Sequence, residues 1–271
     1  MTARPATARL RKHHGLGNDF LVLIDLEGHH PVDAGWARAL CDRHRGVGAD
    51  GVIRATPGPD PQSWSMELRN ADGTVAETSG NGLRCLAQAL VLSGAGVGPD
   101  LAIATAAGLR RARVGPTGPD GRAEVSVGMG RAVLGPEQAT ESPDRRGRRV
   151  DLGNPHLVVL VPDPTAVDVG AEGRAEESRV PGGINVEFAA VTAPGVVLIR
   201  TWERGAGETE ACGSGSCAVA AVLRDWGLVG DAVEVVNPGG RVHVGFEGPD
   251  GGDLVLTGPA QFVCEVEVPV P

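Results

Sequence analysis

Short apolar runs, each bounded by glycine, proline or charged residues, recur along the whole chain. Such runs, rich in Val, Ile and Phe, are typical of strands. The predicted strands are 20–25, 123–129, 157–161, 186–191, 196–202, 233–236 and 262–268. Apolar residues at helical spacing predict helices at 33–43, 83–92 and 218–226. Because strands and helices do not alternate regularly, we expect an α+β fold and not a simple parallel βαβ array.

Two pairs of segments repeat in the same order. GLGNDFLVLID begins at Gly15 and DLGNPHLVVLV begins at Asp151, and their Gly-Asn pairs are 136 positions apart. In 66–92 and again in 198–223, a strand-like stretch leads through a polar turn and a Gly-rich segment into an apolar helix. Two ordered matches with similar offsets predict one duplicated structural unit.

The composition shifts between the two copies. A turn-rich segment, 115–122, and a charged segment, 136–149, flank the predicted strand 123–129. We place the boundary near residue 118, with an N-terminal half at 1–118 joined by a returning strand at 260–271, and a C-terminal half at 119–259. The basic run 145–149 is expected to be a solvated loop, with a polyanion site as the lesser alternative.

Composition and charge exclude several classes of protein. A formal net charge of -9 argues against a nucleic-acid protein whose affinity depends on neutralising phosphates. No apolar run reaches the roughly 18 residues of a membrane span, and the basic start is not followed by the apolar stretch of a secretory signal. The 5 cysteines imply no disulfide framework. A reducing cytoplasm is the expected setting.

Several residues with possible chemistry have simpler interpretations. Cys85 and Cys217 follow the Gly-rich segments on predicted helices, and Cys41 and Cys264 are likewise expected to be packed apolar positions. The histidine pairs at 13–14 and 29–30 are expected near the surface, without a metal. The G-x-G-x-x-G pattern at 46–51 is rejected as a dinucleotide site, because no apolar strand precedes it and no helix follows it.

The two Gly-rich segments, TSGNGLRCLAQAL and ACGSGSCAVAAVL, carry the candidate chemistry. Each places a small nucleophilic side chain, Ser79 or Cys212, before a glycine at the start of an apolar helix. Unpaired N–H groups and the helix dipole at such an end favour a bound carboxylate. We also expect the helix end to lower the pKa of the Cys212 thiol.

Two such ends facing each other could hold one small anion, with one side chain on each face of a carbon atom. This geometry suits removal of a proton from one face and return of a proton to the other. The predicted reaction class is racemisation or epimerisation next to a carboxylate, with helix-end donors stabilising the developing charge.

Segments that cover nearly the whole chain resemble the diaminopimelate epimerase family of two-thiol, cofactor-independent amino-acid racemases. The segments that carry the resemblance are HGLGNDFLVLID, CDRHRGVGADG, RNADGTVAETSGNGLRC, DLGNPH, GGINVEF, ERGAGETEACGSGSCA and TGPAQFV. The resemblance implies two similar halves, each with strands around a central helix, and an active site in the cleft between them. It implies conversion of LL-2,6-diaminopimelate to the meso isomer in lysine biosynthesis, without metal or organic cofactor, by an enzyme that often forms homodimers.

Site residues follow from the same resemblance. Cys212 would be one catalytic thiol, and Ser79 stands where the family has the other. His156 would support the site. The substrate-binding residues would be Asn18, Asn70, Gly80, Asn81, Asn154, Asn185, Glu203, Arg204, Gly213 and Ser214. Taken without the resemblance, the asparagines are common turn residues, and Glu203 with Arg204 could form an ordinary surface ion pair.

Ser79 departs from the family pattern. A serine about 5 pKa units more basic than a thiol costs roughly 7 kcal/mol more to ionise, although it could donate a hydrogen bond or relay a proton through water. Serine is also a preferred helix N-cap, so capping alone is a structural alternative. Three explanations remain open: an engineered Cys→Ser exchange, a natural variant that epimerises by a modified route, and a relative with one working thiol. That relative would be a lyase or dehydratase, or a non-catalytic amino-acid-binding protein.

Overall fold

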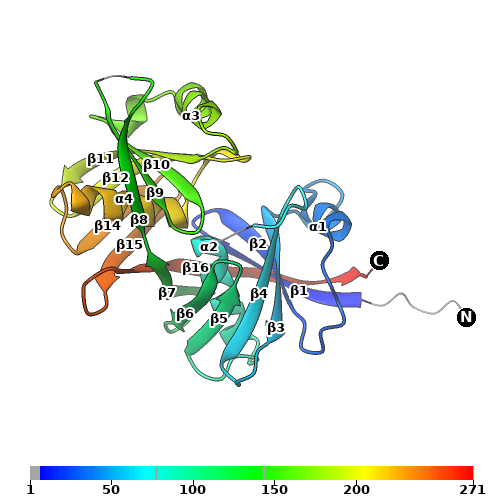
Figure 1. Cartoon of the computed structure of the whole chain (residues 1–271). Coiled ribbons are helices and arrows are strands. Elements are labelled where there is room, and N and C mark those ends of the chain that lie inside the picture. Colours follow the sequence, from blue (N-terminus) through cyan, green and yellow to red (C-terminus); the bar gives the residue numbers. More distant parts are fainter. Residues whose placement is uncertain (1–6, 77–78, 143, 271) are drawn as a thin grey trace, which may run out of the picture. The chain divides into compact units, whose positions relative to one another are not determined.

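The computed structural model describes residues 7–76, 79–142 and 144–270 (Figure 1). The chain forms two compact units, Met1–Val127 with Pro259–Pro271, and Gly128–Gly258. The boundary near residue 118 that we expected from the turn-rich segment differs from this division. Residues 115–122 instead join two strands of the first unit, where the Gly115 N–H donates to the Glu124 carbonyl and the Gly118 N–H to the Arg122 carbonyl.

The first unit is a closed ring of strands around one helix. Its elements are β1 (Thr7–Gly15), β2 (Asn18–Ile24), α1 (Ala34–Cys41), β3 (Gly51–Pro57), β4 (Ser63–Asn70), α2 (Gly80–Leu92), β5 (Asp100–Thr105), β6 (Gly108–Val114), β7 (Arg122–Arg131) and the C-terminal part of β16 (Asp253–Pro269). The strand order is β1-β2-β3-β4-β5-β6-β7-β16, and β16 pairs again with β1, which closes an eight-stranded barrel.

The second unit repeats this plan. Its elements are β8 (Val133–Ala139), β9 (Arg146–Asp151), β10 (Pro155–Leu160), the 3-10 helix η1 (Pro164–Ala166), α3 (Val169–Ser178), β11 (Asn185–Ala193), β12 (Val196–Glu203), β13 (Gly207–Thr209), α4 (Gly213–Asp225), β14 (Ala232–Asn237), β15 (Gly240–Glu247) and the N-terminal part of β16. The strand order is β8-β9-β10-β11-β12-β14-β15-β16, and the short β13 pairs with β12.

The topology confirms the predicted duplication. In the first unit, β2 and β3 are parallel across α1, and β4 and β5 are parallel across α2. In the second unit, β10 and β11 are parallel across α3, and β12 and β14 are parallel across α4. Parallel neighbours need a crossover, and a helix supplies it each time. The neighbouring hairpins in both units are antiparallel, as expected for an α+β fold.

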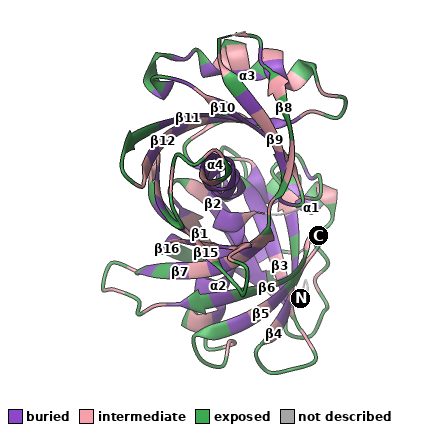
Figure 2. Cartoon of the chain, turned by 60° about the vertical axis from the view of Figure 1, so that its left-hand side comes forward, coloured by how far each residue is buried: buried purple, intermediate pink, exposed green. Residues whose placement is uncertain are grey.

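Helices α2 and α4 are the central elements of their units. Each has 13 residues, nearly all of them buried and mostly small or aliphatic (Figure 2). A helix that is apolar on all sides must be covered on all sides, and the surrounding strands of each unit do this. The start of each helix is therefore held at a fixed place in its unit.

Three local expectations were wrong. The basic run is not a loop, because residues 146–149 belong to strand β9. In this strand Arg146 forms an ion pair with Glu137, and Arg148 forms one with Asp225. Carboxylates on the neighbouring strand β8 and on helix α4 compensate these arginines, which makes a strand of this charged sequence possible. His13 is fully buried and not at the surface, whereas Cys264 is exposed and not packed.

Helix α3 was also not predicted, because it buries few residues and carries no continuous apolar stripe.

No described helix has the length and apolar character needed to cross a lipid bilayer.

Candidate functional site

Ser79 and Cys212 occupy the same structural position in their units. Each is the N-cap of its central helix, with extended backbone (ψ of 113° in both). The Gly82 N–H donates to Ser79 Oγ at 3.0 Å, and the Gly215 N–H donates to Cys212 Sγ at 3.2 Å. The N–H groups of Gly80, Asn81, Gly213 and Ser214 lie in the first turn, where no intrahelical carbonyl can accept them. Both helix ends are therefore candidate anion sites.

Cys212 lies in a buried polar network of the second unit. Its Sγ is 3.5 Å from Ser214 Oγ, and the Asn154 amide nitrogen donates to that hydroxyl at 3.4 Å. The Asn154 amide oxygen lies 3.1 Å from Nε2 of His156. His156 Nδ1 lies 2.7 Å from Oε1 of Glu187, and both of these side chains are fully buried. The structure thus connects four residues predicted from the sequence to one that was not, Glu187.

Glu203 stands beside the thiol at the end of β12. Thr209 donates its hydroxyl to Glu203 Oε1 at 2.6 Å. Burial raises the pKa of the Glu203 carboxyl, and the negative charge of Glu187 adds to this. The carboxyl is thus held nearer to its neutral form than an exposed glutamate would be.

The expected low pKa of the Cys212 thiol is wrong. Burial raises the pKa of Cys212 well above its usual value, and the charges of Glu203 and Glu187 raise it further. Hydrogen bonds from Ser214 and Gly215 act in the opposite direction but are the smaller effects. At rest the residue is therefore a thiol and not a thiolate, because desolvation and two carboxylates outweigh the helix end.

Asn185 and Arg204 meet at the start of β11 and the end of β12. The Arg204 backbone N–H donates to Asn185 Oδ1 at 2.8 Å, and its Nη1 donates to the Gly182 carbonyl at 3.3 Å. Arg204 is exposed. A guanidinium in this position can form a two-pronged contact with a ligand carboxylate.

The first unit has its own polar cluster at the start of α2. The Asn81 amide nitrogen donates to Asn18 Oδ1 at 3.1 Å, and Asn18 in turn donates to Asp50 Oδ2 at 2.8 Å. The buried Arg84 donates to Asn81 Oδ1 at 2.8 Å. This chain of donors fixes the orientation of both amides.

Asn70 lies apart from these hydrogen bonds. Its side chain is exposed and donates to Thr74 Oγ1 at 3.1 Å. The described side-chain hydrogen bonds of Asn70 do not connect it to Asn18 or Asn81.

Two carboxylates of these clusters were not predicted from the sequence, the exposed Asp50 and the fully buried Glu187. Asp50 follows a glycine-rich turn and accepts from Asn18 and from Arg43. Glu187 interrupts the apolar run INVEFAAV, and an acid in a buried strand was a usable signal for a polar partner. The described residues contain no group of three or more His, Cys, Asp or Glu side chains placed to hold a metal ion.

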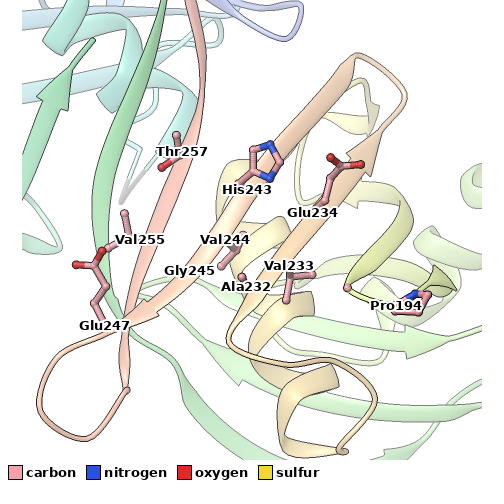
Figure 3. Close-up of a pocket in the computed structure, with 11 residues that line it drawn as sticks. Pro194, Ala232, Val233, Glu234, His243, Val244, Gly245, Glu247, Val255 and Thr257 are labelled. Carbon is pink, nitrogen blue, oxygen red and sulfur yellow. The ribbon is translucent and has the colours of Figure 1, made fainter.

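A surface depression of about 410 Å³ lies elsewhere in the second unit (Figure 3). It forms over β14, β15 and β16, where Gly245 contributes no side chain and Glu234 and His243 stand on paired strands. Glu234 is already paired with Arg241. No predicted site residue lines this depression.

Comparison with solved structures places this fold in a known class. A structure described as a predicted epimerase from Pseudomonas aeruginosa matches with a TM-score of 0.74 at 20% identity, over 96% of this chain and 99% of the other. A hydroxyproline epimerase from Agrobacterium vitis, solved with bound trans-4-hydroxy-L-proline, matches with a TM-score of 0.73 at 21% identity, over 97% of this chain and 93% of the other. The chain therefore has the two-unit α+β fold found in these epimerases.

Sequence comparison is more specific. The family model for diaminopimelate epimerase matches residues 10–135 and 148–263. The diaminopimelate epimerase of Mycobacterium ulcerans is 39% identical, over 95% of both chains. That of Streptomyces coelicolor is 39% identical, over 94% of this chain and 93% of the other. The chain belongs to the diaminopimelate epimerase family, which confirms the family resemblance, the expected fold class and the expected enzyme class, an amino-acid epimerase.

Proposed function

We propose that the protein converts LL-2,6-diaminopimelate to the meso isomer, a step of lysine biosynthesis, with no metal or organic cofactor. One observation carries the proposal: the Cys212 thiol caps a central helix beside Glu203 and the His156–Glu187 pair, in a chain of this family. The reaction breaks the C–H bond at one α-carbon and forms a new one on the opposite face. The electron pair spreads into the adjacent carboxylate in between.

In this proposal Cys212 and Ser79 act on opposite faces of the same α-carbon. The Cys212 thiol, protonated at rest, is suited to deliver the proton. Ser79 stands on the face where the proton is removed. Its hydroxyl either relays this proton to a water molecule or donates a hydrogen bond to the water molecule that accepts the proton. The roughly 7 kcal/mol cost of a serine alkoxide makes direct removal by Ser79 too slow to compete.

The helix-end N–H groups hold the carboxylate at the reacting centre. Gly80, Asn81, Gly213 and Ser214 supply these donors, and charge that develops on the carboxylate strengthens their hydrogen bonds. Arg204 and Glu203 recognise the amino-acid ends of the substrate, one by its guanidinium and the other by its carboxyl. The asparagines at 18, 70, 154 and 185 complete the polar lining.

The test compares the wild type with Ser79→Cys and Cys212→Ala. Exchange of the α-hydrogen is followed in deuterated water with LL and meso diaminopimelate. We expect slow exchange by the wild type, a gain of several orders of magnitude on Ser79→Cys and loss of exchange on Cys212→Ala. Absence of exchange in both the wild type and Ser79→Cys refutes the proposal. Release of ammonia or a keto acid would identify a lyase, and calorimetric binding without turnover would identify a binding protein.

The proposal includes a cytoplasmic setting and a homodimer. A thiol mechanism needs a reduced cysteine, which a reducing compartment maintains. Sedimentation of the purified protein tests the homodimer, and a single monomeric species would exclude it.

A further inference from the structure

We propose that Glu187 is the positioning residue of the Cys212 site: its buried carboxylate orients His156 and, through it, the amide of Asn154. The inference rests on the proposed function. It assigns to this site a residue that neither the sequence analysis nor the family resemblance had placed there.

The position of Glu187 follows from the strand alternation of β11. Val186 and Phe188 belong to the apolar cluster that includes Leu157 and Val167. Because alternate residues of a strand point to opposite faces, Glu187 points away from that cluster. It lies on the face where α4 begins, and it has no exposed surface.

One carboxylate oxygen of Glu187 has a hydrogen-bond partner and the other has none in the part of the chain that the structure describes. Oε1 accepts from His156 Nδ1 at 2.7 Å, whereas Oε2 has no hydrogen-bond partner among the described residues. A buried carboxylate costs free energy unless it is paired. Among the described residues, the only side-chain hydrogen bond of Glu187 is the one to the His156 imidazole, so the buried carboxylate acts directly on that ring.

The contacts of His156 show what that role is. Its Nδ1 faces the Glu187 carboxylate and its Nε2 faces the Asn154 amide oxygen. Both neighbours are hydrogen-bond acceptors, so the two contacts fix the orientation of the imidazole ring. With its oxygen held by His156, Asn154 must point its amide nitrogen at Ser214, next to the thiol.

Gly215 allows the carboxylate to approach the thiol. A Cβ at this position would lie 2.5 Å from Glu187 Oε1 and 3.1 Å from Cys212 Sγ. The carboxylate and the sulphur are thus separated by little more than the space that one methyl group would need. The titratable groups that face this space are Cys212 itself, Glu203 from β12, His156 from β10 and Glu187 from β11.

The test is Glu187→Gln, which keeps the shape and the acceptor for Nδ1 but removes the charge. The matched control is Glu176→Gln, since Glu176 is also a buried carboxylate of this unit but lies on α3, paired with Arg179. We expect Glu187→Gln to lower kcat by at least about tenfold with KM within about twofold. The pH profile of kcat should move to lower pH, because one negative charge beside Cys212 is gone. Glu176→Gln should change neither kcat nor the profile.

A readout independent of turnover is the ¹⁵N spectrum of the His156 ring, assigned with His156→Asn. Glu187→Gln should move the two ring ¹⁵N resonances away from their wild-type positions, and Glu176→Gln should leave them unchanged. An unchanged ring spectrum, or a kcat that falls no more than in Glu176→Gln, overturns the positioning role. A changed ring spectrum in a protein that exchanges no α-hydrogen would support the positioning role and refute the proposed function instead.

Discussion

Replacing Gly215 by alanine tests the geometry of the thiol site most directly. The added Cβ would lie 2.5 Å from Glu187 Oε1, 3.1 Å from Glu187 Cδ and 3.1 Å from Cys212 Sγ. Distances under about 3 Å force the carboxylate to move, because van der Waals repulsion rises steeply there. The carboxylate cannot move without lengthening its 2.7 Å contact with His156.

The matched control is Gly82→Ala, at the same position of α2. There the Cβ would lie 3.2 Å from Ser79 Cβ, 3.2 Å from Ser79 Oγ and 3.3 Å from Ile53 Cδ1, so neighbours need shift only slightly. Alanine in a helix gains up to about 1 kcal/mol over glycine at either site. Overpacking a buried site costs about 1–3 kcal/mol. We therefore expect Gly82→Ala to be within about 1 kcal/mol of the wild type and Gly215→Ala to lose about 2 kcal/mol.

The assay is urea unfolding followed by tryptophan fluorescence and circular dichroism, with α-hydrogen exchange measured on the same preparations. Gly215→Ala should also lose kcat, because a displaced Glu187 no longer orients His156. The reasoning is refuted if Gly215→Ala is as stable as Gly82→Ala and retains the wild-type kcat. That result would mean that the carboxylate is free to move away from the helix end without consequence.

Two further predictions concern buried titratable side chains of the first unit. Burial lowers the pKa of His13 from 6.5 to about 4, so the unfolded chain takes up a proton that the folded protein refuses. Stability should therefore be lost as pH falls from 6.5 to 4, by up to about 3 kcal/mol, and unfolding titrations of His13→Leu should show a smaller loss over that range. Asp25 is buried and accepts hydrogen bonds from Arg54 and from the backbone N–H groups of His29 and His30. Asp25→Ala should therefore lower the free energy of unfolding by about 3–5 kcal/mol. Urea unfolding measures this loss, and an unchanged midpoint would exclude a stabilising role for Asp25.

The sequence predicted much of the fold because the repeat and the apolar runs are local signals. The predicted strand 196–202 lies within β12, and the predicted helix 83–92 lies within α2. The repeat also aligned Ser79 with Cys212, and the structure shows that both are N-caps of their central helices. Helix α3 was missed because its helical character depends on a few contacts and a capping Asp168, and not on an apolar stripe. The charged strand β9 was missed because its stability comes from carboxylates on other elements.

The site was predicted less completely, for a similar reason. The residues of the Gly-rich segments could be found from helix-end chemistry and the family pattern. The roles of Glu187 and Asp50 depend on side chains that are distant in sequence, His156 and Asn18, and no spacing rule connects them. The pKa of Cys212 could not be predicted because it depends on burial and on two carboxylates that the fold brings to the helix end.

The two caps show that folding does not distinguish oxygen from sulphur at these positions. Ser79 and Cys212 each accept one N–H from the residue three positions later, at 3.0 and 3.2 Å. An exchange of serine and cysteine at either position would thus keep the hydrogen bond that begins the central helix. The choice between oxygen and sulphur at these positions is therefore a matter of acid–base chemistry and not of helix capping.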